Sequence, residues 1–281
     1  MTATLPPPIA PNAPAPAPPR PSSRPSPGAR LAWIIAGAVL SIALLGWGTF
    51  QVIGLLAHEE FDEETTLDAA GVTRIDIDND VGPVTVRTGA GDSIRIEAHV
   101  SEGLKAPSRD IEVVGDTLHV DGSCGIVMTT WCSVSFTLTV PAGLDLVAHS
   151  DHSRVEVEGD FATVDAGTAN GGVTFTGAAD SVRLRSRNGS VRAPSIESPR
   201  VDASTSNGSV RLTFENAPES VVARSANGSV EVVVPRGDEL YRVDADTSHG
   251  STEITVRTDP ESTRVIEAHT RNGDVTVRSA S

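Results

Sequence analysis

Aromatic residues, cysteine and lysine are scarce in this chain of 281 residues. Aromatic side chains make up 4% of the chain, there are 2 cysteines, and Lys105 is the single lysine. Sites that cut polysaccharides usually combine paired carboxylates with aromatic platforms, so this composition argues against such an enzyme. Metal sites built from four cysteines are excluded, because only two are present.

Basic charge is also in short supply. The chain has 22 Lys and Arg residues against 37 Asp and Glu residues, which gives a net charge of −15 at pH 7. Binding to nucleic acid depends on clustered positive charge that neutralises phosphates. We therefore expect no nucleic-acid partner.

Recognisable catalytic motifs are absent as well. The sequence contains no GxSxG, HExxH, phosphate-binding or calcium-loop pattern. One grouping of possible metal ligands is His149, Asp151 and His152, but at the two-residue period of a strand His152 points away from the other two. We interpret these three as solvated residues and assign no catalytic residue, metal ligand or cofactor. The chain is predicted not to be an enzyme, and a polysaccharide-active enzyme is the third hypothesis for its function.

Proline and long apolar runs are concentrated at the N-terminus. Residues 1–30 hold 11 of the 19 prolines and no acidic residue, which is typical of a disordered tail. Residues 31–56 then continue for 26 positions without a charge. As a helix they would be roughly 39 Å long, enough to cross a hydrocarbon core of about 30 Å. We predict one transmembrane helix over 31–56, in contact with the lipid bilayer.

The charges on either side of this stretch predict its orientation. Arg20, Arg24 and Arg30 precede it, and an acidic segment, 57–70, follows it and is expected to form a stalk. By the positive-inside rule the tail is cytoplasmic and the larger C-terminal part is extracytoplasmic, in a single-pass protein of the cell membrane. A cleaved signal peptide is the alternative, but the apolar run is long and no small-residue cleavage site follows it promptly. We therefore favour an uncleaved signal anchor.

The two cysteines lie close together in SCGIVMTTWCS. In an exported domain, Cys124 and Cys132 are expected to form a local disulfide, because a redox site usually has the CxxC spacing and a zinc site needs more ligands. Free thiols are the alternative.

Residues 71–281 alternate apolar and polar residues. Pairs such as Ile75 and Ile77, or Val84 and Val86, recur with Thr, Ser, Arg or Glu between them. Apolar residues at period two describe strands with one buried face, so this part is predicted to be all-β.

The alternation becomes a repeat from about residue 147. Units such as VDASTSNGSVRL and VVARSANGSVEV share a two-residue turn, and the turns are spaced 18 to 23 residues apart. Asn-Gly tolerates positive φ well, so each pair is predicted to mark a tight turn between two strands. The predicted turn residues are Asn170, Gly171, Asn188, Gly189, Asn207, Gly208, Asn227, Gly228, His249, Gly250, Asn272 and Gly273.

Two architectures satisfy this repeat. In a hairpin meander or sandwich, the two strands flanking each turn would pair with each other. In a β-solenoid, a β-helix-like repeat domain, the turns of successive repeats would instead stack and the strands would run parallel and in register. The persistent turn and the recurring small residues Ala203, Ala223, Ala245 and Ala268 favour the solenoid.

The recurrent V-x-A-x-[ST]-x-[NH]-G-[SGD]-[VT] unit behind one apolar segment resembles the bacterial putative-adhesin family of β-strand-repeat proteins. The resemblance covers about residues 70–281. It implies an envelope-exposed surface protein and supplies no catalytic residue.

These observations predict a membrane-anchored surface or scaffold protein that binds a protein or polymer partner outside the cell. The alternative is an envelope-sensing regulator that signals through the N-terminal tail. The final repeat, TRNGDVTVRSAS, has no cap after it in the sequence, and Arg271, Asp274 and Arg278 protect its edge only in part. That C-terminal rung is therefore predicted to be a docking surface, for another copy of the chain or for another envelope protein.

Overall fold

The structure is a computed structural model that describes residues 27–56, 59–102, 107–124 and 132–280. Its contacts divide the chain into two compact units, Met1–Val52 and Ile53–Ser281. Most of the predicted proline-rich tail, residues 1–26, lies outside the described residues.

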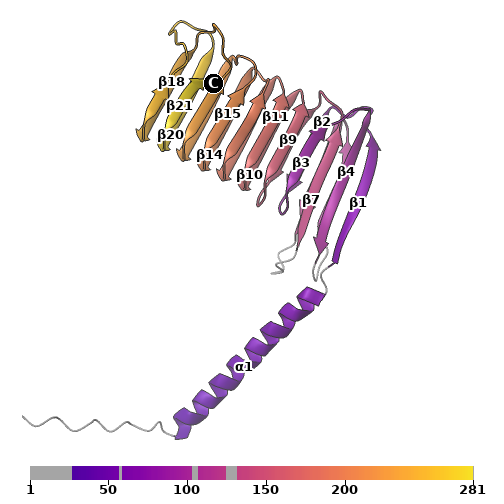
Figure 1. Cartoon of the computed structure of the whole chain (residues 1–281). Helices are drawn as coiled ribbons and strands as arrows, with labels where there is room; N and C mark the ends of the chain where they lie inside the picture. The colour runs from indigo at the N-terminus through magenta and orange to yellow at the C-terminus, as the bar shows by residue number, and fades with distance from the viewer. Residues whose placement is uncertain (1–26, 57–58, 103–106, 125–131, 281) are drawn as a thin grey trace, which may run out of the picture. The chain divides into compact units, whose positions relative to one another are not determined.

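The helix α1 (Pro27–Leu56) is 30 residues long, and its residues up to Val52 belong to the first unit (Figure 1). It covers the predicted helical stretch and begins within the segment that was expected to be tail. Within the described part of the chain, no helix meets the combined length and hydropathy required of a membrane span.

The second unit is built from two β-sheets (Figure 1). The eleven-stranded sheet contains, in spatial order, β1 (Glu59–Asp68), β4 (Ser93–Glu102), β7 (Ser133–Val140), β3 (Val84–Thr88), β9 (Val155–Asp160), β11 (Val173–Ala178), β13 (Val191–Ile196), β15 (Val210–Phe214), β17 (Val230–Val234), β21 (Val275–Ser279) and β19 (Thr252–Ile254). The ten-stranded sheet contains β18 (Arg242–His249), β20 (Val265–Asn272), β16 (Ser220–Asn227), β14 (Arg200–Asn207), β12 (Ser181–Asn188), β10 (Thr163–Asn170), β8 (Asp145–Ser150), β2 (Arg74–Asn79), β6 (Thr117–Ser123) and β5 (Ser108–Val114).

Each repeat supplies one strand to each sheet, and we call such a pair of strands a rung. The repeat VDASTSNGSVRL forms β14 and β15, yet Val201 of β14 pairs in parallel with Val182 of β12 and Val221 of β16. Parallel, in-register pairing between successive repeats is the solenoid arrangement. The hairpin meander is wrong, because it would require β14 to pair with β15.

The core lies between the two sheets and is filled by the inward residues of both. Most of these are Val, Ile, Leu and Ala with no exposed surface. Ala203, Ala223 and Ala268 occupy equivalent positions and are fully buried, whereas Ala245 is only partly buried. Small residues therefore fill a narrow interior, as the repeat predicted. The exception is the rung that contains β18, which is the last in spatial order.

The acidic segment 57–70 differs from its prediction as a stalk. Glu59–Asp68 forms β1, which pairs antiparallel with β4 along its whole length, and Leu67 packs against the core. The inward residues Thr65 and Leu67 lie among many acidic neighbours. The apolar–polar alternation that marks a strand is therefore hard to see in this segment. The folded domain consequently begins before residue 71.

Chain order and stacking order differ at both ends of the solenoid. Near the C-terminus, β20 lies between β16 and β18, and β21 lies between β17 and β19. Near the N-terminus, the rung of β2 and β3 lies between the rung of β6 and β7 and the rung of β8 and β9. The final repeat in the sequence is therefore an interior rung, and the terminal rung is formed by β18 and β19.

The prediction of an exposed edge at the final repeat is wrong for this reason. A physical cause is visible at the turn: Asn272 of β20 donates a hydrogen bond to Asn227 of β16 at 2.8 Å, which continues a row of asparagines. His249 holds the corresponding position in β18 and would interrupt that row if β18 lay beside β16. The repeat with asparagine extends the stack, and the repeat with histidine ends it.

Candidate binding surfaces

The predicted turn residues form one continuous edge of the solenoid. Asn188 Nδ2 donates to Asn170 Oδ1 at 2.9 Å, and the same bond is repeated from rung to rung. The other bonds of this asparagine ladder run from Asn207 to Asn188 (2.8 Å), from Asn227 to Asn207 (3.0 Å) and from Asn272 to Asn227 (2.8 Å). The amides satisfy one another along the stack.

A second row of polar contacts supports the same edge. The hydroxyl of Thr205 donates to the backbone oxygen of Gly189 at 2.7 Å, and the hydroxyl of Ser225 donates in the same way to Gly208 at 2.8 Å. These hydroxyls are nearly buried, so each bond satisfies a group that water cannot reach. The Ser or Thr two residues before each asparagine thus has a structural role.

The glycines of this edge are required by close backbone approach. A Cβ at Gly189 would lie 1.8 Å from the backbone oxygen of Gly171, and one at Gly208 would lie 2.2 Å from that of Gly189. Gly208, Gly228, Gly250 and Gly273 have positive φ, whereas no non-glycine residue of the described chain does. The asparagines end extended strands, and each turn joins the two sheets rather than two strands of one hairpin. This edge is occupied by its own contacts and offers no ligand site.

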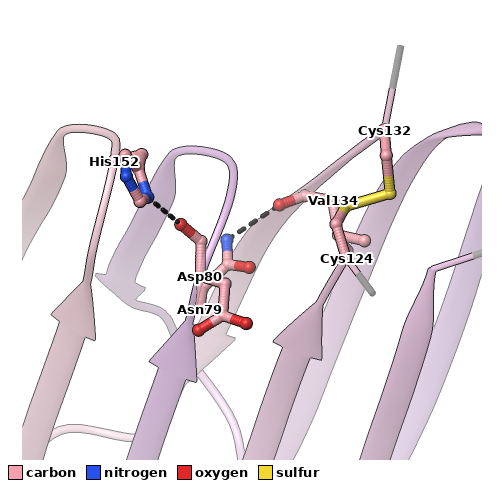
Figure 2. The surroundings of a disulfide bond; sticks show 6 residues. All are labelled: Asn79, Asp80, Cys124, Cys132, Val134 and His152. Atoms are coloured by element: carbon pink, nitrogen blue, oxygen red, sulfur yellow. Dashed lines mark hydrogen bonds between the residues drawn. A yellow bond between two sulfur atoms is a disulfide. The ribbon is translucent and has the colours of Figure 1, made fainter. Parts of the chain in front are cut away.

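The cysteines meet at the corner between β6 and β7. Cys124 and Cys132 are joined by a disulfide with a Cα–Cα distance of 6.0 Å, beside the buried side chain of Asn79 (Figure 2). Asn79 Nδ2 donates to the backbone oxygens of Gly82 (3.0 Å) and Val134 (2.8 Å), so it ties this corner together. The structure describes no free cysteine.

The grouping of His149, Asp151 and His152 is divided by the fold. His152 Nδ1 donates to the backbone oxygen of Asp80 at 3.1 Å (Figure 2). The imidazole of His149 instead lies over Gly167 on the outer face of the ten-stranded sheet, where a Cβ on that glycine would be 2.8 Å from its ring. Among the described residues, no three His, Cys, Asp or Glu side chains are placed to hold a metal ion.

The outer face of the ten-stranded sheet has a basic centre between two acidic ends. Arg183, Arg185 and Arg187 all point outward from β12. Toward β2 and β6, partial burial and the charges of Asp121 and Asp80 raise the pKa of Asp78. Toward β18, Asp244 and Asp246 lie within 4.0 Å and 3.8 Å of His269. A ligand on this face therefore meets positive charge at the middle and negative charge on both sides.

The centre of that face contains a hollow of about 410 Å³ that includes Arg74, Thr163, Arg200 and Ser220 among its lining residues. Arg183 lies across it, 3.5 Å from Asp165 and 4.0 Å from Asp202. Arg183 is thus already paired with two carboxylates, and Arg200, which lines the same hollow, lies 3.8 Å from Glu219.

The two ends of the solenoid differ in how they are finished. At the N-terminal end, the guanidinium of Arg109 in β5 lies over the ring of Phe61 in β1, 5.1 Å from its centroid, and pairs with Glu63. Because β5 and β1 belong to different sheets, Arg109 clasps the two layers together, and we call this the closed end.

The other end, formed by β18 and β19, is the open end. Val243 and Ala245 of β18 are only partly buried, and Ile254 of β19 is 42% exposed. A hollow of about 430 Å³ lies there, lined by Tyr241, Ile254 and Val256 among others. The hydroxyl of Tyr241 is buried without a hydrogen-bond partner, and burial followed by the charge of Glu239 raises the pKa of this phenol. The core is thus incompletely covered at the open end.

Sequence reasoning located the cysteines and the turn edge but missed the basic centre and the open end. Arg183, Arg185 and Arg187 alternate with buried residues in the sequence, which is a visible signal for three outward side chains on one strand. Their surroundings depend on which strands lie beside β12, and that is decided by the parallel register.

Comparison with known proteins supports the repeat. Residues 145–278 match the family Toastrack DUF4097. None of the curated proteins matches this chain.

Three solved structures illustrate the likeness of the domain. A "putative adhesin" from Parabacteroides merdae ATCC 43184 has 12% identity and a TM-score of 0.46, and the match covers 79% of this chain and 97% of that one. A "putative adhesin" from Bacteroides fragilis NCTC 9343 has 12% identity, a TM-score of 0.42 and the same coverage. A "putative lipid binding protein" from Parabacteroides distasonis ATCC 8503 has 11% identity and a TM-score of 0.29, covering 78% and 97%.

Proposed function

Proceeding from the Toastrack DUF4097 domain that residues 145–278 form, we propose that this chain is a membrane-anchored scaffold of the cell envelope. In this proposal α1 is the anchor, the β-repeat domain lies outside the cell, and the open end binds a protein partner by adding a strand. The single observation that carries the proposal is the incompletely covered rung of β18 and β19.

The anchor is supported by the chemistry of α1. Its described apolar side chains have no cover: Trp33 is 76% exposed and Ile42 is 70% exposed. The hydroxyl of Ser41 donates a hydrogen bond to the backbone oxygen of Gly37, and the hydroxyl of Thr49 donates to the backbone oxygen of Leu45, both at 2.8 Å. Apolar side chains all round and polar groups satisfied internally are what a hydrocarbon environment demands of a helix.

The orientation is supported by charge and by the disulfide. Three arginines precede the apolar stretch and an acidic strand follows it, which is the asymmetry expected when the N-terminus is cytoplasmic. The Cys124–Cys132 bridge is the form that cysteines take in an oxidising compartment, outside the cytoplasm.

A protein partner, rather than a polymer, is supported by the backbone at the open end. The backbone N–H of Arg242 donates to the backbone oxygen of Arg264. In β18, every second residue, starting from Arg242, therefore forms its backbone hydrogen bonds toward β20. In a parallel ladder the alternate residues, including Val243 and Ala245, then direct their N–H and C=O groups toward the free edge. Another polypeptide strand matches such a row of donors and acceptors, and it would also cover Ile254.

The topology is tested by adding a protease to intact cells. We expect cleavage beyond residue 58 and protection of the first 30 residues, with the apolar stretch still attached to the domain. A mature chain that begins near residue 57, or a protected β-repeat domain, would contradict the anchor.

The docking end is tested by hydrogen exchange at β18, measured in native membranes and in the purified full chain in detergent. Partner binding predicts slower exchange at Val243 and Ala245 in membranes, and loss of that protection in Ile254→Lys. The matched control is Val113→Lys, because Val113 is 48% exposed on β5 at the closed end. Equal exchange in both preparations would exclude a partner at this end.

A further inference from the structure

A second surface, on the outer face of β12, has the chemistry of an anion site. We propose that Arg185 and Arg187 bind a phosphate-type oxyanion carried by a ligand that is otherwise uncharged. This inference depends neither on the membrane anchor nor on the open end.

The first observation is that these two guanidinium groups have no carboxylate partner. Within the described residues, Arg183 is paired with Asp165 and Asp202, and Arg224 pairs with Glu267 at 2.6 Å. No ion pair in the described chain involves Arg185 or Arg187. They are therefore unpaired positive charges on this face, between its two acidic ends.

The second observation is that only small residues flank them. In the parallel register, Arg185 lies between Gly167 of β10 and Ser204 of β14. The same register places Arg187 between Ala169 and Ser206. A hollow of about 350 Å³ results, into which both arginines, these serines and His149 face.

Gly167 has a specific part in shaping this hollow. A side chain there would collide with the imidazole of His149, which lies over the glycine at 2.8 Å from the position of a Cβ. Because the glycine is bare, the His149 ring lies over β10 and so extends toward β12. One wall of the hollow is therefore a ring nitrogen and the opposite wall is a pair of serine hydroxyls, all of them groups that can donate hydrogen bonds to an anion.

The spacing of the arginines favours a tetrahedral oxyanion. Residues i and i+2 of a strand are about 6.6 Å apart, so the two guanidinium groups can approach one anion from two sides. Each can donate paired N–H···O bonds of about 2.8 Å, and a phosphate-type group has enough oxygen atoms to accept from both. Lysine would not provide this forked geometry.

The charges around the hollow limit the size of the ligand. Asp151 also lines the hollow, and the acidic ends of the face lie beyond it on both sides. The arginines attract one anionic group. A long polyanion, however, would extend over Asp78 in one direction or Asp246 in the other, where like charges meet. At physiological ionic strength, charges within about 8 Å still repel one another. The structure therefore favours an isolated anionic group on a neutral body, such as a substituted sugar chain, over a polyphosphate.

Arginine-specific labelling with phenylglyoxal tests this site, with the full chain in detergent and inorganic phosphate as the probe at constant ionic strength. We expect phosphate to slow the labelling of Arg185 and Arg187 several-fold and in a saturable manner. The exposed Arg192, on the opposite sheet, serves as the internal reference and should be unaffected. Equal slowing at Arg192 would show general screening and overturn the proposal, as would the absence of any slowing.

Two variants distinguish cooperation between the arginines from a simple loss of charge. Arg185→Gln should remove the protection of Arg187, while the matched variant Arg192→Gln should leave it intact. Ser206→Asp, which adds a carboxylate at an exposed flank, should abolish protection at both arginines without unfolding the domain. Protection of Arg187 that persists in Arg185→Gln would mean that the two do not share one anion. Stronger protection by long-chain polyphosphate than by phosphate would contradict the limit on ligand size.

Discussion

The two ends of the solenoid solve the same problem in different ways. Both must stop a stack of parallel strands whose core would otherwise be open. The closed end adds the antiparallel strands β1, β4 and β5, a disulfide corner, and Arg109 as a clasp between the sheets. The open end only places β18 and β19 outside the final repeat and leaves Ile254 exposed. An end that is finished by its own chain needs no partner, whereas an end that is merely terminated leaves its edge available.

The order of the rungs explains how this difference arises. At the open end the chain passes over one position, forms the outer rung, and returns to fill the gap with the repeat that carries Asn272. That repeat can join the asparagine ladder, and its Ile266 and Ala268 are fully buried. The polar, histidine-bearing repeat is left outside, where burial is incomplete.

The largest expected effect contrasts a stacked turn with a hairpin turn. Gly273→Ala, next to the open end, would place a Cβ 2.5 Å from the backbone oxygen of Gly228 at a φ of +145°. Gly115→Ala, in the β5–β6 hairpin at the closed end, has a φ of +68° and open space around it. We expect a loss in the free energy of unfolding of more than about 3 kcal/mol for Gly273 and about 1 kcal/mol for Gly115. Urea denaturation of both variants measures the difference, and equal losses would mean that backbone stacking is not what selects glycine.

Reduction of the disulfide probes the closed end alone. Opening the Cys124–Cys132 loop should lower the free energy of unfolding by about 2 to 3 kcal/mol in the chain-entropy model. The domain should remain folded, because the clasp by Arg109 and the stacked rungs persist. Circular dichroism and denaturation of the Cys124→Ser/Cys132→Ser variant, with and without reductant, provide the measurement. A sensitivity to reductant that survives in this variant would have a different origin.

Removal of the clasp sharpens the comparison between the ends. Arg109→Ala loses the cation–π contact with Phe61 and the pair with Glu63, and we expect a cost of about 1 to 2 kcal/mol. Ile254→Lys, at the open end, should change the stability of the isolated protein by less than about 0.5 kcal/mol, because its side chain is already in water. Thermal unfolding of both variants measures the two losses of stability. A larger cost for Ile254→Lys than for Arg109→Ala would reverse the assignment of closed and open ends.

The smallest effect is a difference in pH dependence. Glu231 in β17 accepts hydrogen bonds from Arg211 (2.8 Å) and from Arg278 (2.9 Å), and these bonds, Arg211 first, lower the pKa of its carboxyl group. Its stabilising contribution is therefore present above the ordinary pKa of Glu and is lost as the pH falls through the lowered pKa. At the other end the pKa of Asp78 is raised, so its contribution is present below the ordinary pKa of Asp and is lost as the pH rises through the raised pKa.

Acidification should thus lower the stability of the rungs near Glu231 and raise the stability of the rungs near Asp78. Glu231→Gln should lower the free energy of unfolding by about 1 kcal/mol at neutral pH and should converge with the parent protein in acid. Asp78→Asn should instead be neutral or stabilising at pH 7 and should also converge in acid. Unfolding curves collected across the acidic range test both signs, and a constant gap for Glu231→Gln would refute the assignment.

Much of the fold and little of the binding chemistry could be read from the sequence. The two-residue alternation of Val201, Ala203 and Thr205 identifies a strand and its buried face, and the recurring Asn-Gly pair identifies the repeat. The surroundings of Arg185 could not be read in this way, because its neighbours Gly167 and Ser204 belong to other repeats and become neighbours only through the register.

The sequence by itself determined the elements: an uncharged helical stretch, a set of short strands, stacked glycine turns and a pair of cysteines close enough to bridge. These follow from local preferences and from periodicity, which act over a few residues. Only the tertiary structure decided which rung stands last, because that depends on competition between Asn272 and His249 for a place beside Asn227. It likewise decided that the acidic segment Glu59–Asp68 becomes a strand, since β1 forms only where β4 presents an edge to receive it.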